Sequence, residues 1–362
     1  MFLALKEFRH ARLRYSLIAF VIAMVASLVF ILSGLANGLA AGNSEALDAI
    51  DADAFVVASG SEFLLDRSRL STDTVTAVVE ADGLEEAQAF STTAGNVRKG
   101  DSEDLIGVSI IAVEPDSFLS PGVDSGSSLA DAPEGLVIDQ SLASEGVEIG
   151  DVLSFDPSGA EYEVVGITDG YQYRLAPTLF VNIESMPEIS PESADVRNAI
   201  AIRGEGDAID ALGESVDGIM IGSTSKLVES LPGYQEQALT LNLIQVFLIV
   251  IAAGIIAAFF FILTLQKMSE LGVMKALGAT SRVLANSLVI QAGILGAIGV
   301  LIGIAAGCTI SFLADGVVPY QIRWEQMAMY GFLLLLVAVV GTLLSLIRIA
   351  RVDPLDAINS AN

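Results

Sequence analysis

Four long apolar runs restrict how this chain can fold more than any other feature. They are residues 17–41, 239–265, 285–314 and 328–347. Each run is long enough to cross a hydrocarbon core of about 30 Å, which takes about 20 helical residues. We therefore expect four transmembrane helices. The first run resembles a signal peptide in its basic start, but it is longer than the usual apolar core of one, so we interpret it as an uncleaved span.

Basic residues indicate how these spans are oriented. They precede the first run, separate the second from the third, and follow the fourth: Lys6, Arg9, Arg12, Arg14, Lys267, Lys275, Arg282, Arg348 and Arg351. Positive charge favours the cytoplasmic side, so we expect both termini in the cytoplasm of a bacterial cell and the protein in its cell membrane. The long polar segment and the loop 315–327 then lie outside.

The expected organisation has nine parts along the chain. They are a cytoplasmic amphipathic helix (1–15), transmembrane helix 1 (16–42), an extracellular α+β domain (43–236), transmembrane helix 2 (237–265), a cytoplasmic coupling loop (266–283), transmembrane helix 3 (284–314), an extracellular loop (315–327), transmembrane helix 4 (328–348) and a cytoplasmic tail (349–362). The fold class is thus a membrane protein of four α-helices with an α+β domain inserted between the first two.

The segment 43–236 mixes strand and helix patterns, which predicts one or two small lobes. Apolar runs bounded by turn residues predict short strands at 53–59, 105–113, 135–139, 151–155, 162–168, 178–183, 198–203 and 216–222. Polar caps predict helices at 71–83 and 139–146 and another that opens at Ser223–Ser225 and bends at Pro232 and Gly233.

Charge and motifs exclude several functions. The segment 43–236 holds 38 acidic and 8 basic residues, a net charge of −30, which argues against a nucleic-acid partner and is as expected for a soluble surface domain. The sequence contains no phosphate-binding GxxxxGK[ST] loop, no HExxH and no nucleophile elbow. Cys308 and His10 are the only residues of their kinds. We therefore expect a protein without enzymatic activity or an intrinsic cofactor.

Two motifs resemble those of a known family, the FtsX/MacB-type permeases of ABC transporters. The stretch from Glu270 to Ala279, ELGVMKALGA, resembles the loop between the second and third spans of that family, and the terminal RIARVDPLDAI resembles its C-terminal pattern. The stretch 135–168 resembles part of the family's extracytoplasmic domain. The order of spans and domain fits as well, so the resemblance covers nearly the whole chain.

The resemblance implies a mechanism and partners. Two permease chains would pair with two subunits that bind and hydrolyse ATP, and ATP-driven movement would reach the spans by mechanotransmission. The coupling residues would be Glu270, Gly272, Lys275 and Gly278. The residues alone also favour a short docking helix there over a plain basic turn, because Val273, Met274 and Leu277 form one apolar face.

Gly34, Gly38 and Gly42 lie four residues apart, which places them on one face of a helix. Such small-residue strips let helices approach closely in lipid. In the family the first and second spans lie near the dimer axis, so we expect this strip to pack between two copies of the chain. Packing within the chain is the alternative. The third span repeats the spacing at Gly299, Gly303 and Gly307.

Glu45 falls on the same helix face just beyond the glycines, while Tyr234 and Glu236 precede the second span. A carboxylate near lipid is costly without a partner. Hydrated side chains that point outward are the plain alternative. The other interpretation is a ligand site between subunits, in which these three residues bind heme and Glu45 supplies an oxygen donor to its iron, because no histidine lies in the external segment.

The sequence therefore predicts the permease subunit of an ABC efflux pump that resembles the heme-exporting branch of the family. It would take heme from the outer leaflet, in contact with membrane lipid, and expel it laterally. The alternatives are a lipid-like or peptide-antibiotic substrate, or a signalling permease that transports nothing and controls a cell-wall hydrolase.

Overall fold

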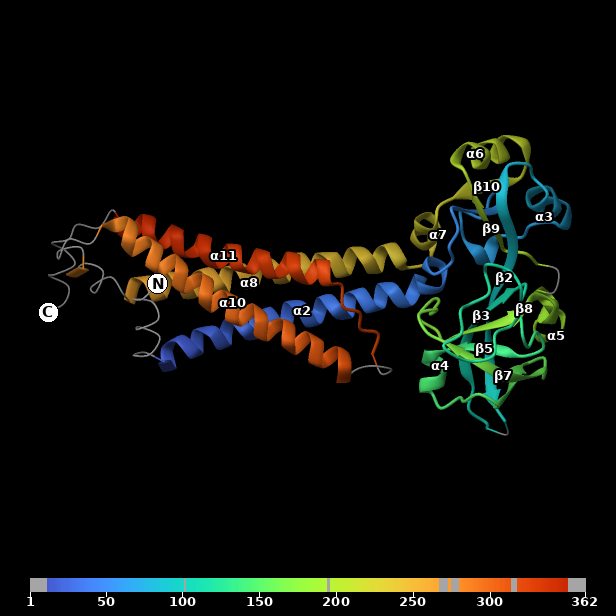
Figure 1. Ribbon diagram of the computed structural model, residues 1–362, viewed down its shortest axis with the longest axis horizontal. Coiled ribbons are helices and arrows are strands. Elements are labelled where there is room, and N and C mark those ends of the chain that lie inside the picture. Colours follow the sequence, from blue (N-terminus) through green and yellow to red (C-terminus); the bar gives the residue numbers. More distant parts are fainter. Residues whose placement is uncertain are drawn as a thin grey trace. The chain divides into compact units, whose positions relative to one another are not determined.

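The computed structural model describes residues 12–100, 102–193, 196–266, 273–274, 280–313 and 318–350. The chain divides into two compact units. The first unit contains Met1–Gly38 and Leu239–Asn362, and the second contains Leu39–Ala238. Figure 1 labels the helices and strands of both units.

Four helices are long and apolar enough to cross a membrane. They are α2 (Arg12–Asp48), α8 (Tyr234–Gln266), α10 (Ser281–Leu313) and α11 (Trp324–Ala350). The four apolar helices expected from the sequence are thus confirmed. Helix α2 continues to Asp48 without interruption. The boundary between the units falls within this helix, and its residues 39–48 belong to the second unit.

Small residues allow the helices of the first unit to pack closely. Gly299 of α10 lies against Ile22 of α2, and Gly303 lies against Ala26, so a Cβ atom at either glycine would overlap α2. The glycine strip of the third span therefore serves packing within the chain. Because lipid provides little hydrophobic drive for helix association, such close contact stabilises the bundle.

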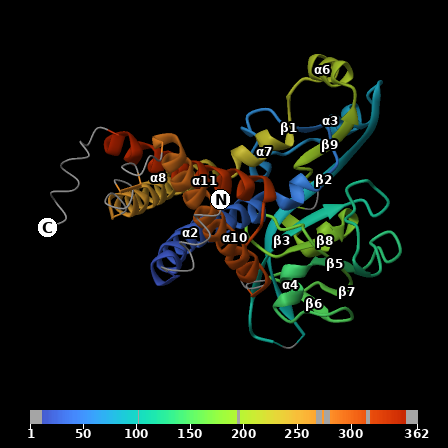
Figure 2. The ribbon, with the colours of Figure 1, turned by 60° about the vertical axis from the view of Figure 1, so that its left-hand side comes forward.

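The second unit, called here the inserted domain, has two lobes that the two views in Figures 1 and 2 separate clearly. The first lobe is a four-stranded antiparallel sheet in the order β10-β1-β9-β2. Its elements are β1 (Ala54–Ala58), α3 (Thr72–Val79), the first half of β2 (Leu84–Lys99), β9 (Ala199–Gly204), α6 (Gly206–Ser215) and β10 (Ile219–Gly222). Both helices pack on one face of the sheet. This is the arrangement of a ferredoxin-like split βαβ unit.

The second lobe is inserted between β2 and β9 and closes on itself. The strands pair in the ring β2-β3-β8-β5-β7-β6-β2 around a buried apolar core. The elements are β3 (Ile106–Val113), β4 (Ser125–Gly126), β5 (Leu136–Asp139), α4 (Gln140–Ser144), β6 (Val152–Asp156), β7 (Glu161–Thr168), β8 (Thr178–Asn182) and α5 (Met186–Ile189). Closure leaves few unpaired edges, which protects the lobe from pairing with other chains.

The eight expected strands are all present. The sequence did not predict the short elements β4, α5 and α6, or the long strand β2. Its first half pairs with β9 of the first lobe, and its second half pairs with β3 and β6 of the second lobe. Several of its side chains are exposed, among them Glu85 and Glu86, so the run of apolar residues that marks the other strands is missing. One strand therefore joins the two lobes.

An apolar cluster lies where the two lobes face each other. Phe55 and Phe90 come from the first lobe, and Val137 and Phe180 come from the second. Helix α7 (Thr224–Ser230) covers the same cluster, which we call the central cluster. As expected, α7 begins after the cap residue Ser223, and the chain turns between Ser230 and Tyr234, where α8 begins.

Candidate functional site at the end of the first membrane helix

The last turns of α2 are built into the inserted domain. Ala46 and Leu47 are each 1% exposed and belong to the central cluster. Leu227 of α7 and the partly buried Tyr234 of α8 pack in the same cluster. The end of α2 and the start of α8 therefore share one packed core with both lobes.

The segment 171–175, which leads into β8, fastens this helix end to the second lobe through backbone hydrogen bonds. Leu175 N–H donates to the carbonyl oxygen of Gly42 at 2.7 Å, and Arg174 N–H donates to that of Asn43 at 3.2 Å. In return, Ala46 N–H donates to the carbonyl oxygen of Gln172 at 3.0 Å. We call residues 171–175 the docking segment.

Glu45 faces the docking segment. Its carboxylate accepts a hydrogen bond from the backbone of Gln172, while the carboxylates of Asp139, Asp169 and Asp48 repel it. Asp139 is itself fully engaged, because it caps α4 through Ser141 and accepts from the N–H of Tyr171 at 3.0 Å. The predicted site residue is thus an anchor for the docking segment in this structure.

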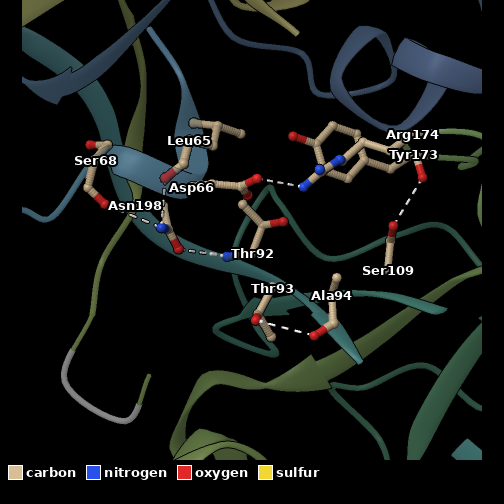
Figure 3. Close-up of polar contacts among 10 residues, drawn as sticks. All are labelled: Leu65, Asp66, Ser68, Thr92, Thr93, Ala94, Ser109, Tyr173, Arg174 and Asn198. Carbon is tan, nitrogen blue, oxygen red and sulfur yellow. Dashed lines mark hydrogen bonds and ion pairs between the residues drawn. The ribbon is translucent and has the colours of Figure 1, made fainter. Parts of the chain in front are cut away.

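Tyr173 and Arg174 anchor the docking segment to residues outside α2 (Figure 3). Tyr173 is 2% exposed, and burial raises the pKa of its hydroxyl well above the ordinary value. The Ser109 hydroxyl donates to the Tyr173 carbonyl at 2.9 Å, and the Arg174 guanidinium pairs with Asp66 at 2.7 Å. Asp66 belongs to the turn η1 (Leu65–Arg67), which precedes α3.

The turn around Asp66 is in turn held by the first lobe. The Asn198 amide donates to the carbonyl oxygens of Leu65 and Ser68, and its own oxygen accepts from Thr92 N–H at 2.8 Å (Figure 3). Asn198 is 5% exposed, so these bonds are shielded from water. A continuous polar path therefore leads from the first lobe through Asp66 and Arg174 to the end of α2.

The three glycines of α2 each accept a close neighbour. A Cβ atom at Gly34 would overlap the ring of Tyr320, and one at Gly38 would overlap the backbone of Pro319, in the loop between α10 and α11. At Gly42 it would lie 2.8 Å from Gln172 Oε1 and 2.9 Å from Leu175 Cδ2. The contacts that this single chain shows are thus within the chain, the alternative noted from the sequence. Packing of the strip between two copies stays a prediction.

The other predicted site residues lie in two places. Glu236 is exposed in the first turn of α8, two residues after Tyr234. Near them Asn43 Nδ2 lies 3.4 Å from Gln237 Oε1, which links the ends of α2 and α8. The coupling residues Glu270, Gly272, Lys275 and Gly278 lie outside the described residues, as do residues 1–11 and the tail from 351.

The described residues include no group of three or more His, Cys, Asp or Glu side chains arranged to hold a bare metal ion. Heme iron needs only one or two axial donors, so the role expected of Glu45 does not require such a group. Sequence reasoning singled out Glu45, whose role as a ligand stays a prediction. It did not point to Gln172, Arg174 and Asp66, because nothing local marks residues that lie near α2 only in the folded chain.

Four apolar helices with an α/β domain between the first and the second define a multi-pass membrane protein with a large aqueous domain. Models of two families match this chain: the MacB-like periplasmic core domain over residues 16–219 and the FtsX-like permease C-terminal region over residues 242–354. The chain therefore belongs to the FtsX/MacB-type permeases of ABC transporters. It is a non-catalytic subunit, and such permeases work with ATPase partner subunits.

Relatives align over nearly the whole chain. A protein of Staphylococcus haemolyticus named as a hemin transport system permease, HrtB, is 26% identical over 99% of both chains. An uncharacterised ABC transporter permease of Mycobacterium tuberculosis is 21% identical over 98% of this chain and 97% of its own. The solved periplasmic region of MacB from Actinobacillus actinomycetemcomitans is 12% identical, with a TM-score of 0.37 over 51% of this chain and 95% of its own.

Proposed function

We propose that this chain is the permease subunit of an efflux pump that removes heme from the outer leaflet of the bacterial cell membrane. The observation that favours heme is the alignment with relatives named for hemin transport, which runs over 99% of both chains. The alignment includes all four helices and the inserted domain. A shared region of that extent supports a shared substrate more than a match confined to one domain does.

In the proposed assembly, two copies of this chain pair with two ATPase subunits, with the inserted domain outside and both termini in the cytoplasm. The basic flanks of the spans support this orientation. Helix α8 supports a second copy, since only 22% of its most apolar stretch is buried within the chain, against 39–44% in the other three. A helix of a second copy packed against α8 would raise the buried share of α8 towards that of the other three helices.

The movement proposed here starts at the ATPases and reaches the spans through Glu270, Gly272, Lys275 and Gly278. From there α2 and α8 pass it outward. The packing of Ala46, Leu47 and Tyr234 in the central cluster supports this, because a packed core transmits displacement instead of absorbing it. Closure of the outer ends of the helices would then expel the ligand laterally.

Glu45 is the proposed oxygen donor to heme iron, with Glu236 as the alternate and Tyr234 in support. A carboxylate has two oxygens and can accept several hydrogen bonds, so the bond from Gln172 leaves Glu45 chemically able to bind iron. The site proposed at this helix end takes one heme per two chains.

A hemin titration of the purified complex tests the proposal through its Soret absorbance. We expect a distinct band at one hemin per two chains, and we expect Glu45→Ala and Glu45→Gln to shift or abolish it, because an amide is a far poorer ligand for ferric iron. If Glu236→Ala alone removes the band, the ligand is on the second span. If wild type shows no specific band, a lipid-like or peptide-antibiotic substrate is favoured, and a cell-wall hydrolase bound to the inserted domain would favour signalling.

A further inference from the structure

The docking segment contacts Glu45, the proposed oxygen donor to heme iron. Within residues 171–175, the N–H groups of Gln172, Arg174 and Leu175 all donate to the end of α2: to Glu45, Asn43 and Gly42 respectively. A carboxylate held in this way by a backbone amide is directed towards the segment. The docked segment therefore occupies one hydrogen-bonding position of the Glu45 carboxylate.

The docked state contains local strain. Arg174 and Leu175 have φ values of 59° and 57°, the left-handed region that few residues other than glycine adopt. Two consecutive strained residues persist only where surrounding contacts hold them, and such strain is concentrated at switch regions. Here the contacts are the bonds to α2, the ion pair between Arg174 and Asp66, and the hydrogen bond from Ala176 N–H to the Tyr173 carbonyl that closes the turn.

We propose that residues 171–175 form a latch with two states. In the closed state, seen here, the latch binds the end of α2 and donates a hydrogen bond to the half-buried carboxylate of Glu45. The docked latch thereby masks part of this carboxylate. In the open state the strain at Arg174 and Leu175 is relaxed, the ion pair with Asp66 is broken, and Glu45 is accessible. Movement of α2 favours one state over the other, so the transport cycle controls when heme can reach the carboxylate of Glu45.

The effect of the latch on heme binding rests on the proposed function, whereas the existence of the latch does not. If Glu45 is accessible in only a fraction of the molecules, the apparent association constant for heme is the intrinsic constant multiplied by that fraction. A variant that opens the latch should therefore bind hemin more tightly by the same factor by which it raises the fraction of open molecules. A variant that stabilises the closed state should bind hemin more weakly.

Hydrogen–deuterium exchange of the full chain in nanodiscs tests the latch without any ligand. Arg174→Ala removes a partly exposed ion pair, which should speed exchange at Leu175 and at Ala46 together, by about two- to fivefold. Arg98→Ala is the matched control, since it breaks a comparable ion pair of 2.8 Å with Asp156 elsewhere in the second lobe. Leu175→Gly relieves the left-handed strain and should slow exchange at both amides.

The outcomes decide between the two claims. If Arg174→Ala leaves exchange unchanged, or speeds it at Leu175 but not at Ala46, the latch is overturned. If exchange rises as expected but a parallel hemin titration shows the same affinity in Arg174→Ala and wild type, masking of Glu45 is overturned. If no variant binds hemin, the heme proposal fails while the exchange result still decides whether the latch exists.

Discussion

Leu175 and Gly42 are joined by a hydrogen bond of 2.7 Å, from the backbone N–H of the first to the carbonyl oxygen of the second. A residue that leads into β8 thereby binds the last turns of a membrane helix. The approach is possible because Gly42 has no Cβ atom to meet Gln172 and Leu175. This junction ties the last turns of α2 to the second lobe.

Gly42→Val should weaken the junction, whereas Gly42→Ala should change it little. The atoms nearest to an added Cβ are the ends of two flexible side chains, which can move for a methyl group. A branched side chain needs more room, and overpacking of this kind costs about 1–3 kcal/mol. Protease digestion between residues 169 and 176 measures the release. Equal resistance of Gly42→Val and wild type would show that the segment does not need this close approach.

Gly38→Ala should be more damaging than Gly42→Ala, even though the new side chain is the same. The atoms in the way belong to the backbone of Pro319, which cannot rotate aside. We expect a loss of about 1–3 kcal/mol in stability, seen as a lower melting temperature in detergent. Gly293→Ala in α10 is the control, because an added Cβ there meets nothing within 4 Å. Similar melting temperatures of Gly38→Ala and Gly293→Ala would contradict the close contact between Gly38 and the backbone of Pro319.

Tyr173→Phe should remove the last step of the alkaline titration of tyrosine. Burial raises the pKa of Tyr173 above the ordinary value of 10.0. A group with a raised folded-state pKa contributes stability that is complete below the unfolded pKa and is lost as pH rises through the folded pKa. Tyrosinate absorbance of the folded chain should therefore lack its most alkaline component in Tyr173→Phe. Loss of absorbance from the ordinary tyrosine step instead would mean that Tyr173 is accessible to water.

Glu270→Ala with Lys275→Ala should separate ATP hydrolysis from transport. Both residues belong to the motif that resembles the family's coupling loop, so the double variant should insert and assemble normally but transport at a small fraction of the wild-type rate. The measurement is ATPase activity and efflux in the same proteoliposomes. Normal efflux from the double variant would place the coupling elsewhere.

The sequence predicted the elements of this fold better than the contacts between them. Eight strands have short apolar runs bounded by turn residues, and the four apolar helices need no more than their length. Strand β2 escaped detection because residues such as Glu85, Glu86 and Gln88 suit an exposed surface. Its identity as a strand depends on β3, β6 and β9, which lie far away in the chain.

The candidate site shows the same limit. The spacing of Gly34, Gly38 and Gly42 predicted close approach, but not by which neighbour. Tyr320, against Gly34, and Leu175, against Gly42, are distant in sequence from α2. Likewise, no pattern marks Arg174 and Leu175 as left-handed, since their conformation is imposed by contacts that form only on folding.

Export of hemin from the membrane is the decisive measurement of whether this permease is a heme efflux pump. Proteoliposomes that contain the permease and its ATPase partner are loaded with hemin in the leaflet that corresponds to the cell exterior, with an acceptor such as apomyoglobin in the surrounding buffer. We predict that ATP accelerates the appearance of heme on the acceptor, and that Glu45→Gln abolishes the acceleration while ATP hydrolysis continues. Transfer at the same rate with and without ATP in the wild-type complex would contradict the account.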